Sequence, residues 1–274
     1  MPAPAPDVPA LVPVQEADGD GLVFVAGPGG SAMPEPLRPD LPSLAQSERL
    51  ASWLAAPRSR LLRRAQIGLR QRVLEIGCGH GVVSEELARR VPGELVCLDR
   101  RLEAVQTPPS PSTGRVAADA CDLPFRDACF DLVVCQNILL WVGDLTRAVG
   151  EIARVLEPGG ALVALEPDYG GMMEYPPSVA LREVWIEGLQ AAGADALVGR
   201  KLPAACEEAG LKPCVELLNM PQPATVQGVG LCLGLPLTEP QRARVQEVMA
   251  EIRRARNTWS CFLHLPYFLV LATR

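Results

Sequence analysis

The chain has 274 residues, a formal net charge of −6 and 48% hydrophobic residues, which suits one α/β domain with additions and a substantial core. The acidic balance disfavours a nucleic-acid partner unless a local basic patch overrides it. Nine cysteines without a C-x-x-C pair and two histidines without ligand spacing predict neither a disulfide framework nor a metal site.

Residues 1–45 form a proline-rich tail that we expect to be largely disordered. Ten prolines fall within residues 1–42, and each fixes φ and removes a backbone donor, which opposes a packed helix or a central strand. The run Leu22–Val25 is the exception and is a candidate for a short edge strand. The start lacks the pattern of a signal peptide and no run of about 18 apolar residues occurs, so we predict a cytoplasmic protein without a transmembrane segment.

A helix predicted from about Ser47 to Arg64 opens the folded region and carries a cluster of arginines. Their spacing around Leu61 and Leu62 predicts a solvated amphipathic face rather than a nucleic-acid site. The cluster consists of Arg58, Arg60, Arg63, Arg64, Arg70 and Arg72.

The run from Val73 to Gly81, V-L-E-I-G-C-G-H-G, has the pattern of a buried strand that breaks into a glycine loop before a helix. The glycines let the backbone approach a ligand closely, and the amide-rich start of the helix favours a carboxylate or phosphate. A dinucleotide fingerprint would require a glycine at Val82, but the third glycine is Gly81. This spacing disfavours a nicotinamide oxidoreductase.

Further strands follow at regular intervals. One ends at Asp99, about 20 residues after the loop, where a carboxylate can accept both hydroxyls of a ribose. Others are predicted near 115–118, 130–135 and 160–166, with later strands near 213–218 and 267–272. Right-handed crossovers would place the carboxyl ends of the parallel strands along one edge of the sheet.

Taken in order, these segments resemble the motifs of the class I S-adenosylmethionine (SAM) dependent methyltransferases, and in particular the small-molecule enzymes related to ubiquinone and menaquinone biosynthesis, of methyltransferase type 11. The resemblance covers about residues 50–170. It implies a Rossmann-like, seven-stranded α/β fold with a mostly parallel sheet, an antiparallel last strand and a small helical cover. It also implies that SAM is the cofactor and that a methyl group passes to a small-molecule acceptor by in-line displacement. The segments that carry the resemblance are Glu75 to Gly81, Asp99, Val116 to Phe125, Phe130 to Trp141 and Ile152 to Val163.

The resemblance also implies roles for individual residues. Glu75 would support the methionine end of SAM, Asp99 would hold the ribose, and Asp119 with the Ala120 amide would bind the adenine. The predicted cofactor-binding residues are Glu75, Gly77, Cys78, Gly79, Gly81, Asp99, Arg100, Asp119, Ala120, Gln136 and Asn137.

Beyond the fifth predicted strand the α/β alternation is interrupted. We expect a helical insertion at about 170–200 within a methyltransferase domain at 46–274, and we expect this insertion and residues 222–264 to cover the edge where the methyl group emerges. Many family members need no proton-transferring residue. The catalytic candidates are Asn137, Glu166, Asp168 and Tyr169, and the candidates for binding the acceptor are Trp141, Tyr169, Met172 and Tyr175.

One further class of function stays open at this point, a regulatory or partner-binding protein that binds SAM without turnover. The pattern determines neither the acceptor, nor which atom is methylated, nor the oligomeric state.

Overall fold

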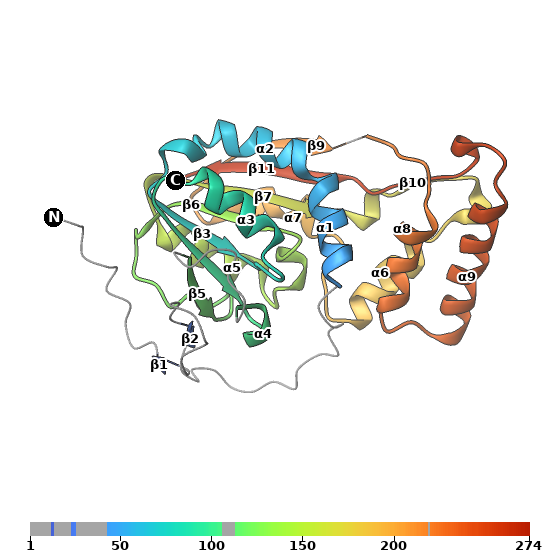
Figure 1. The fold of residues 1–274 in the computed structure, drawn as a ribbon, viewed down its shortest axis with the longest axis horizontal. Coiled ribbons are helices and arrows are strands. Elements are labelled where there is room, and N and C mark those ends of the chain that lie inside the picture. Colours follow the sequence, from blue (N-terminus) through green and yellow to red (C-terminus); the bar gives the residue numbers. More distant parts are fainter. Residues whose placement is uncertain (1–11, 14–22, 26–42, 106–112, 219) are drawn as a thin grey trace.

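The fold is built on one twisted sheet in a computed structural model that describes residues 12–13, 23–25, 43–105, 113–218 and 220–274. Most of the predicted tail therefore lies outside the described residues. The strands run in the order β1-β2-β5-β4-β3-β6-β7-β11-β9 (Figure 1). Their bounds are β1 (Val12–Pro13), β2 (Val23–Val25), β3 (Arg72–Ile76), β4 (Glu94–Asp99), β5 (Gly114–Ala117), β6 (Phe130–Gln136), β7 (Leu156–Pro167), β9 (Lys212–Leu218) and β11 (Tyr267–Thr273).

The seven strands from β5 to β9 confirm the predicted sheet. Strands β3 to β7 pair in parallel, whereas β11 is antiparallel to both β7 and β9. The structure extends this sheet beyond β5, because β2 pairs with β5 in parallel and β1 pairs with β2. The strand order switches at β3, whose two neighbours are β4 and β6: β4 and β5 are added on one side of β3, and β6 and β7 on the other. In open α/β sheets, ligands bind at the carboxyl ends of the strands beside such a switch.

Helices cover both faces of the sheet. Figure 1 shows α2 and α3 on one face and α5 and α7 on the other. The predicted helix from Ser47 to Arg64 is two helices, since α1 ends at Trp53 and α2 begins at Ala55. The helix bounds are α1 (Leu44–Trp53), α2 (Ala55–Arg64), α3 (Val82–Arg90), α4 (Leu102–Val105), α5 (Leu145–Val155), α6 (Arg182–Ala191), α7 (Val198–Glu208), α8 (Val226–Gly230) and α9 (Glu239–Arg254). Short 3₁₀ segments are η1 (Ile67–Leu69), η2 (Leu139–Trp141), η3 (Tyr169–Gly171), η4 (Pro177–Val179), η5 (Leu231–Gly234) and η6 (Thr258–Ser260).

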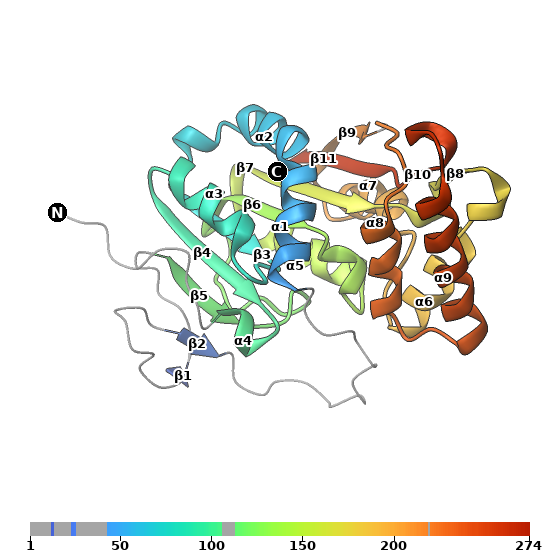
Figure 2. The ribbon, with the colours of Figure 1, turned by 45° about the vertical axis from the view of Figure 1, so that its right-hand side comes forward.

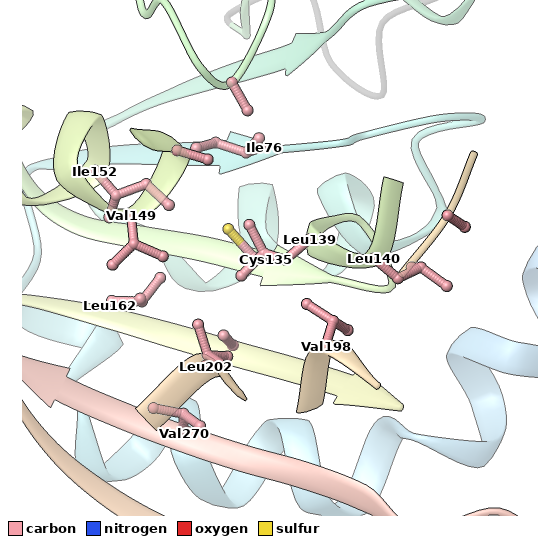
Figure 3. Close-up of a cluster of buried hydrophobic side chains, with 14 of the residues drawn as sticks. Ile76, Cys135, Leu139, Leu140, Val149, Ile152, Leu162, Val198, Leu202 and Val270 are labelled. Carbon is pink, nitrogen blue, oxygen red and sulfur yellow. The ribbon is translucent and has the colours of Figure 1, made fainter. Parts of the chain in front are cut away.

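The apolar side chains of the central strands contribute to two hydrophobic cores, one on each face of the sheet. In β6, Leu132 and Val134 belong to the core under α2, whereas Val133 and Cys135 belong to the core under α5 and α7. This follows from the alternation of side chains along a strand that is covered on both faces. Figure 3 shows the second core, where side chains of α5 and α7 meet those of β6, β7 and β11.

A separate group of elements stands at the end of the sheet where the parallel strands finish (Figures 1 and 2). It contains α6, α8, α9 and an antiparallel pair, β8 (Met173–Tyr175) and β10 (Phe262–His264). We call this group, residues 169–191 and 222–264, the cover. The second segment has the predicted bounds, but the first is shorter than the insertion expected at about 170–200, because α7 begins at Val198 and packs in the core of the main sheet.

Candidate functional site

The loop after β3 has the backbone conformation that its glycines allow. Gly77, Gly79 and Gly81 have φ values of 78°, 50° and 77°, in the left-handed region that side chains disfavour. A Cβ on Gly77 would lie 2.6 Å from the side chain of Ile138, so the close approach at this position requires glycine. The amides of Gly77 and Cys78 donate to the carbonyl of Leu98 at 2.7 and 3.1 Å. These bonds hold the loop against the end of β4.

Asp99 at the end of β4 is tied to the glycine loop. Its Oδ2 accepts from the Gly79 amide at 2.9 Å, and its Oδ1 accepts from the Arg101 amide at 3.0 Å. The residue is only 8% exposed. A carboxylate has about four lone-pair sites, so two remain for a ligand that lies against this strand end. Two neighbouring hydroxyls are the ligand that such a carboxylate suits.

A pocket opens at the carboxyl ends of β3, β4 and β5. Five of the predicted cofactor residues and the acceptor candidate Trp141 lie in its wall. The residues that line it are Ile76, Gly77, Leu98, Asp99, Arg100, Ala118, Asp119, Ala120, Ile138, Trp141 and Val142. Sequence reasoning missed Ile76, Leu98, Ala118, Ile138 and Val142, although each lies within two residues of a predicted position.

Two charged side chains face each other at this pocket. The Oδ1 of Asp119 accepts from the amide of Cys121 at 2.8 Å, which fixes the carboxylate above a turn. The Nε of Arg100 lies 3.9 Å from the Oδ2 of Asp119, and both side chains are more than 40% exposed. This pair therefore lies at the solvent side of the pocket, where it can contact the polar edge of a ligand.

Glu75 lies within β3 and is almost completely buried. Burial raises the pKa of its carboxyl to about 7, although the charge of Arg58 opposes this rise. The thiol of Cys97 lies 3.5 Å from Oε2 of Glu75. Cys78 is also buried, beside Cys97, and the hydrogen bond between the two thiols is the main cause that raises the pKa of Cys78. Glu75, Cys78, Gly79 and Gly81 are not among the residues that line the pocket.

Arg58 does not belong to a solvated face, as the sequence predicted, because its side chain is only 4% exposed. Its guanidinium donates to Oε2 of Glu86 at 2.6 and 2.9 Å, to the Ala51 carbonyl at 3.0 Å and to Oε1 of Gln136 at 2.9 Å. The prediction failed because a helical pattern of arginines cannot show which one meets a carboxylate on another helix. The structure thus places the Gln136 side chain under α2.

Asn137 follows β6 and has φ of 56°, a conformation that asparagine tolerates better than most residues. Its Oδ1 accepts from the hydroxyl of Tyr267 at 2.8 Å, and its backbone amide donates to the Leu165 carbonyl at 3.1 Å. Its Nδ2 is buried and has no hydrogen-bond partner in the described part of the chain. No local signal in the sequence links Asn137 to Tyr267.

Glu166 and Asp168, at the end of β7, are both engaged. The Oε1 of Glu166 accepts from the amides of Ile138 and Leu139 at 3.1 and 3.0 Å, and complete burial raises the pKa of Glu166 to about 7. Asp168 forms a bidentate pair with Arg200, with contacts between 2.7 and 3.1 Å. These geometries suit the positioning of backbone and helix more than direct proton transfer.

The remaining acceptor candidates belong to the cover rather than to the pocket. The ring of Tyr169 lies 5.3 Å from that of Trp185, and burial raises the pKa of Tyr169. Met172 is 8% exposed, whereas Tyr175 is 54% exposed and stacks on Phe262 at 6.0 Å. Trp141 is thus the one predicted acceptor residue that the structure brings to the pocket wall.

Metal centres and membrane-spanning helices are two other kinds of functional feature to consider in residues 12–13, 23–25, 43–105, 113–218 and 220–274. Within those ranges, no three His, Cys, Asp or Glu side chains are grouped as they would be around a metal ion. No helix among the described residues has the length and apolar character required to span a bilayer.

Comparisons with known proteins agree with this geometry. Residues 74–164 match the family described as "Methyltransferase domain". Over 119 residues, 42% of this chain and 34% of the relative, the sequence is 35% identical to the mouse (Mus musculus) protein "Arginine-hydroxylase NDUFAF5, mitochondrial". It is 36% identical to "Demethylmenaquinone methyltransferase" of Mycobacterium marinum over 114 residues, 42% of this chain and 47% of that protein.

Among solved structures, the YcgJ protein of Bacillus subtilis has a similar fold. The TM-score is 0.59 at 19% identity, and the match covers 80% of this chain and 98% of that one. The structural match thus extends over 80% of this chain, whereas its sequence matches span less than half the length of the two curated relatives.

Proposed function

Because residues 74–164 form a methyltransferase domain of the class I SAM-dependent type, we propose that this chain transfers a methyl group from SAM to a small-molecule acceptor. The observation that carries the proposal is the pocket at the switch in strand order, where the glycine loop and the Asp99 carboxylate form one wall. A Cβ on Gly77 would clash with Ile138 in the pocket wall, so this position of the loop requires glycine, and Asp99 keeps lone pairs beyond its two amide bonds, so the residues fit SAM.

SAM supplies a methyl group on a positively charged sulfur, which is already activated for displacement. The chain therefore has to align an acceptor and exclude water, and alignment alone contributes roughly 7 to 11 kcal/mol to lowering such a barrier. We assign Asp99 to the ribose, Asp119 with Ala120 to the adenine, and the glycine loop with Glu75 to the amino-acid end.

Among the catalytic candidates, Asn137 and Tyr169 are the ones we assign to the acceptor. Glu166 and Asp168 position other groups, because Glu166 receives two backbone amides and Asp168 holds Arg200. Deprotonation of the acceptor is thus left to water.

The acceptor class follows from the cover. Tyr169 and Trp185 pack together and Met172 is buried in the cover beyond the carboxyl ends of the strands, and these aromatic and apolar surroundings suit an apolar or aromatic small molecule better than a nucleic acid. We also propose a cytoplasmic location, supported by nine cysteines that the structure leaves as free thiols. As domain boundaries we propose a tail at 1–45 and a catalytic domain at 46–274.

A thermal-shift and calorimetry series tests the assignment. SAM and S-adenosylhomocysteine should stabilise the protein, by about 2.7 kcal/mol at 100 times the dissociation constant, whereas NAD should not. Asp99→Asn removes a charged acceptor from the ribose and should weaken S-adenosylhomocysteine binding about tenfold. The matched control Asp127→Asn changes an exposed aspartate that pairs with Arg154, and it should leave binding unchanged. Equal shifts with NAD, or none with SAM, would refute the proposal.

Binding and turnover must be measured separately, because a SAM-binding regulatory protein would pass the first test. Transfer of labelled methyl groups to a panel of phenols, quinols, amines and thiols decides this point. Stabilisation by SAM without transfer to any acceptor in the panel would favour the regulatory alternative.

A further inference from the structure

The side-chain amide of Asn137 has a defined orientation. The Tyr267 hydroxyl donates to Oδ1 at 2.8 Å, so the other end of the amide must be Nδ2. This Nδ2 is buried and without a hydrogen-bond partner among the described residues. A buried donor without a partner is unfavourable, which marks it as a group that a ligand completes.

Tyr267 is itself held in place, so the orientation of the amide persists. It is 2% exposed at the start of β11, opposite Pro167 of β7. The edge of its ring meets Trp53 of α1 at a centroid distance of 5.1 Å and an angle of 81°. A flip of the Asn137 amide would let Nδ2 donate to the hydroxyl oxygen of Tyr267, but the hydroxyl proton would then lose Oδ1 as its acceptor.

The amide lies on the acceptor side of the site. From the end of β6 it reaches past β7 to β11, whereas the pocket lies at β3, β4 and β5, on the other side of β6. The next residue, Ile138, is part of the pocket wall. Figures 1 and 2 show the cover beyond this same end of the strands. Asn137 therefore stands between the cofactor pocket and the cover.

We propose that Asn137 Nδ2 donates to the nucleophilic atom of the acceptor, and that this atom is an oxygen rather than an amine nitrogen. This inference rests on the proposed methyl transfer and narrows its acceptor class. An oxygen has at least two lone pairs, so it can accept from Nδ2 with one and attack with another. An amine nitrogen has one lone pair, which a fixed donor would occupy. The Oδ1 that would orient an amine N–H already accepts from Tyr267.

In the transfer step, the acceptor oxygen forms its bond to the methyl carbon with its free lone pair, the carbon–sulfur electron pair leaves with sulfur, and the acceptor proton passes to water. A hydrogen bond to the ionised form favours that form, so Nδ2 lowers the pKa of a bound phenol or enol. Phenols and enols are thus the chemical class that this donor selects. Tyr267 acts through Asn137 and is a positioning residue.

Matched pairs of acceptors test the inference, and 1-naphthol with 1-naphthylamine is the first pair. The protein should methylate the naphthol at least about tenfold faster, and the protein loaded with S-adenosylhomocysteine should bind naphthol more tightly in calorimetry. Asn137→Asp keeps the shape and the left-handed backbone but replaces the donor by an acceptor, so both preferences should disappear. Gln66→Glu is the control, because it makes the same amide-to-carboxyl change at an exposed residue with a left-handed backbone, outside the cover and the pocket.

Tyr267→Phe retains the ring against Trp53 and removes only the hydroxyl that orients the amide. It should reduce the naphthol preference while the affinity for S-adenosylhomocysteine changes less than about twofold, a result that a general loss of structure would not produce. Two results would overturn the inference. One is methyl transfer to the naphthylamine that is as fast as, or faster than, transfer to the naphthol. The other is a binding preference for naphthol that is absent in the wild type or that persists in Asn137→Asp. Transfer to amines alone would leave the proposed methyltransferase function intact, whereas SAM binding without any transfer counts against that function instead.

Discussion

At the scale of single residues, the site depends on carboxylates whose surroundings differ. Asp99 is bound by two amides and keeps free lone pairs for a ligand, whereas Glu166 receives two amides deep under the β6 loop. Both follow a strand end, so position along the chain does not separate their roles. Their burial and their partners do, because Glu166 is completely inaccessible and Asp99 lines the pocket.

The raised pKa of Glu166 predicts a pH-dependent stability. The folded carboxyl keeps its proton to about pH 7, whereas an ordinary one ionises near 4.5, so the folded state binds more protons in this window. The free energy of unfolding should therefore fall from pH 4.5 to 7, by about 3 kcal/mol for this group. Glu166→Gln should be more stable than wild type at pH 8 by that amount and equal at pH 4.5.

Urea unfolding at a series of pH values measures this difference. Glu75 has the same raised pKa and stays in the variant, so the pH dependence should be reduced rather than abolished. Glu183→Gln, at a side chain that is 70% exposed, is the control and should not change the slope. A slope in Glu166→Gln equal to that of wild type would contradict the assignment.

At the scale of elements, α2 is attached to the rest of the domain through one buried charge. Arg58 joins this helix to Glu86 of α3, to the end of α1 through the Ala51 carbonyl and to the end of β6 through Gln136. Arg60, two residues further along and on the exposed side of the helix, pairs at the surface with Glu216. The same residue type on one helix thus has two different energetic roles.

These two arginines give a matched pair of variants. Arg58→Met should lower the free energy of unfolding by about 2 to 3 kcal/mol, because it leaves the partly buried Glu86 with Arg90 as its remaining partner. Arg60→Met should cost less than about 1 kcal/mol, as surface pairs do. Chemical denaturation compares the two directly, and equal losses would show that burial of Arg58 has no energetic consequence.

At the scale of the whole molecule, the cofactor pocket and the cover are built from different parts of the chain. The pocket uses residues 76–142, whereas the cover uses 169–191 and 222–264. Ligand affinity and acceptor choice should therefore respond to different substitutions. This separation is a consequence of the sheet, whose strands end at one edge and leave the later segments to close it.

Tyr169→Phe and Met172→Ala test that separation. Each should change the relative rates with different acceptors by about tenfold, because apolar contact area and a hydroxyl are removed from the cover. Binding of S-adenosylhomocysteine should change less than about twofold. Leu69→Ala changes a 71% exposed side chain outside the cover and the pocket and should change neither quantity. An unchanged acceptor preference in both cover variants would rule out the cover as the selecting element.

The sequence by itself determined the seven strands of the central sheet, by their positions along the chain, and the glycine loop. These features depend on local patterns: apolar runs for strands covered on both faces, glycines where φ is positive, and an aspartate at a strand end. Such patterns pointed to Gly77 and Asp99, and the family resemblance implied Arg100, Asp119 and Ala120; all five line one pocket in the structure. Local sequence patterns are enough to identify these positions because each lies at or just after the end of its strand.

Only the tertiary structure decided which side chains meet across the sheet. Tyr267 and Asn137 are 130 residues apart, and Arg58 and Gln136 are 78 apart, so no local pattern joins either pair. The burial of Arg58 and the two amides at Glu166 likewise depend on elements that come together only when the sheet closes. Periodicity reports which face of an element is apolar, but the partner of a buried polar group is set by the packing of distant segments.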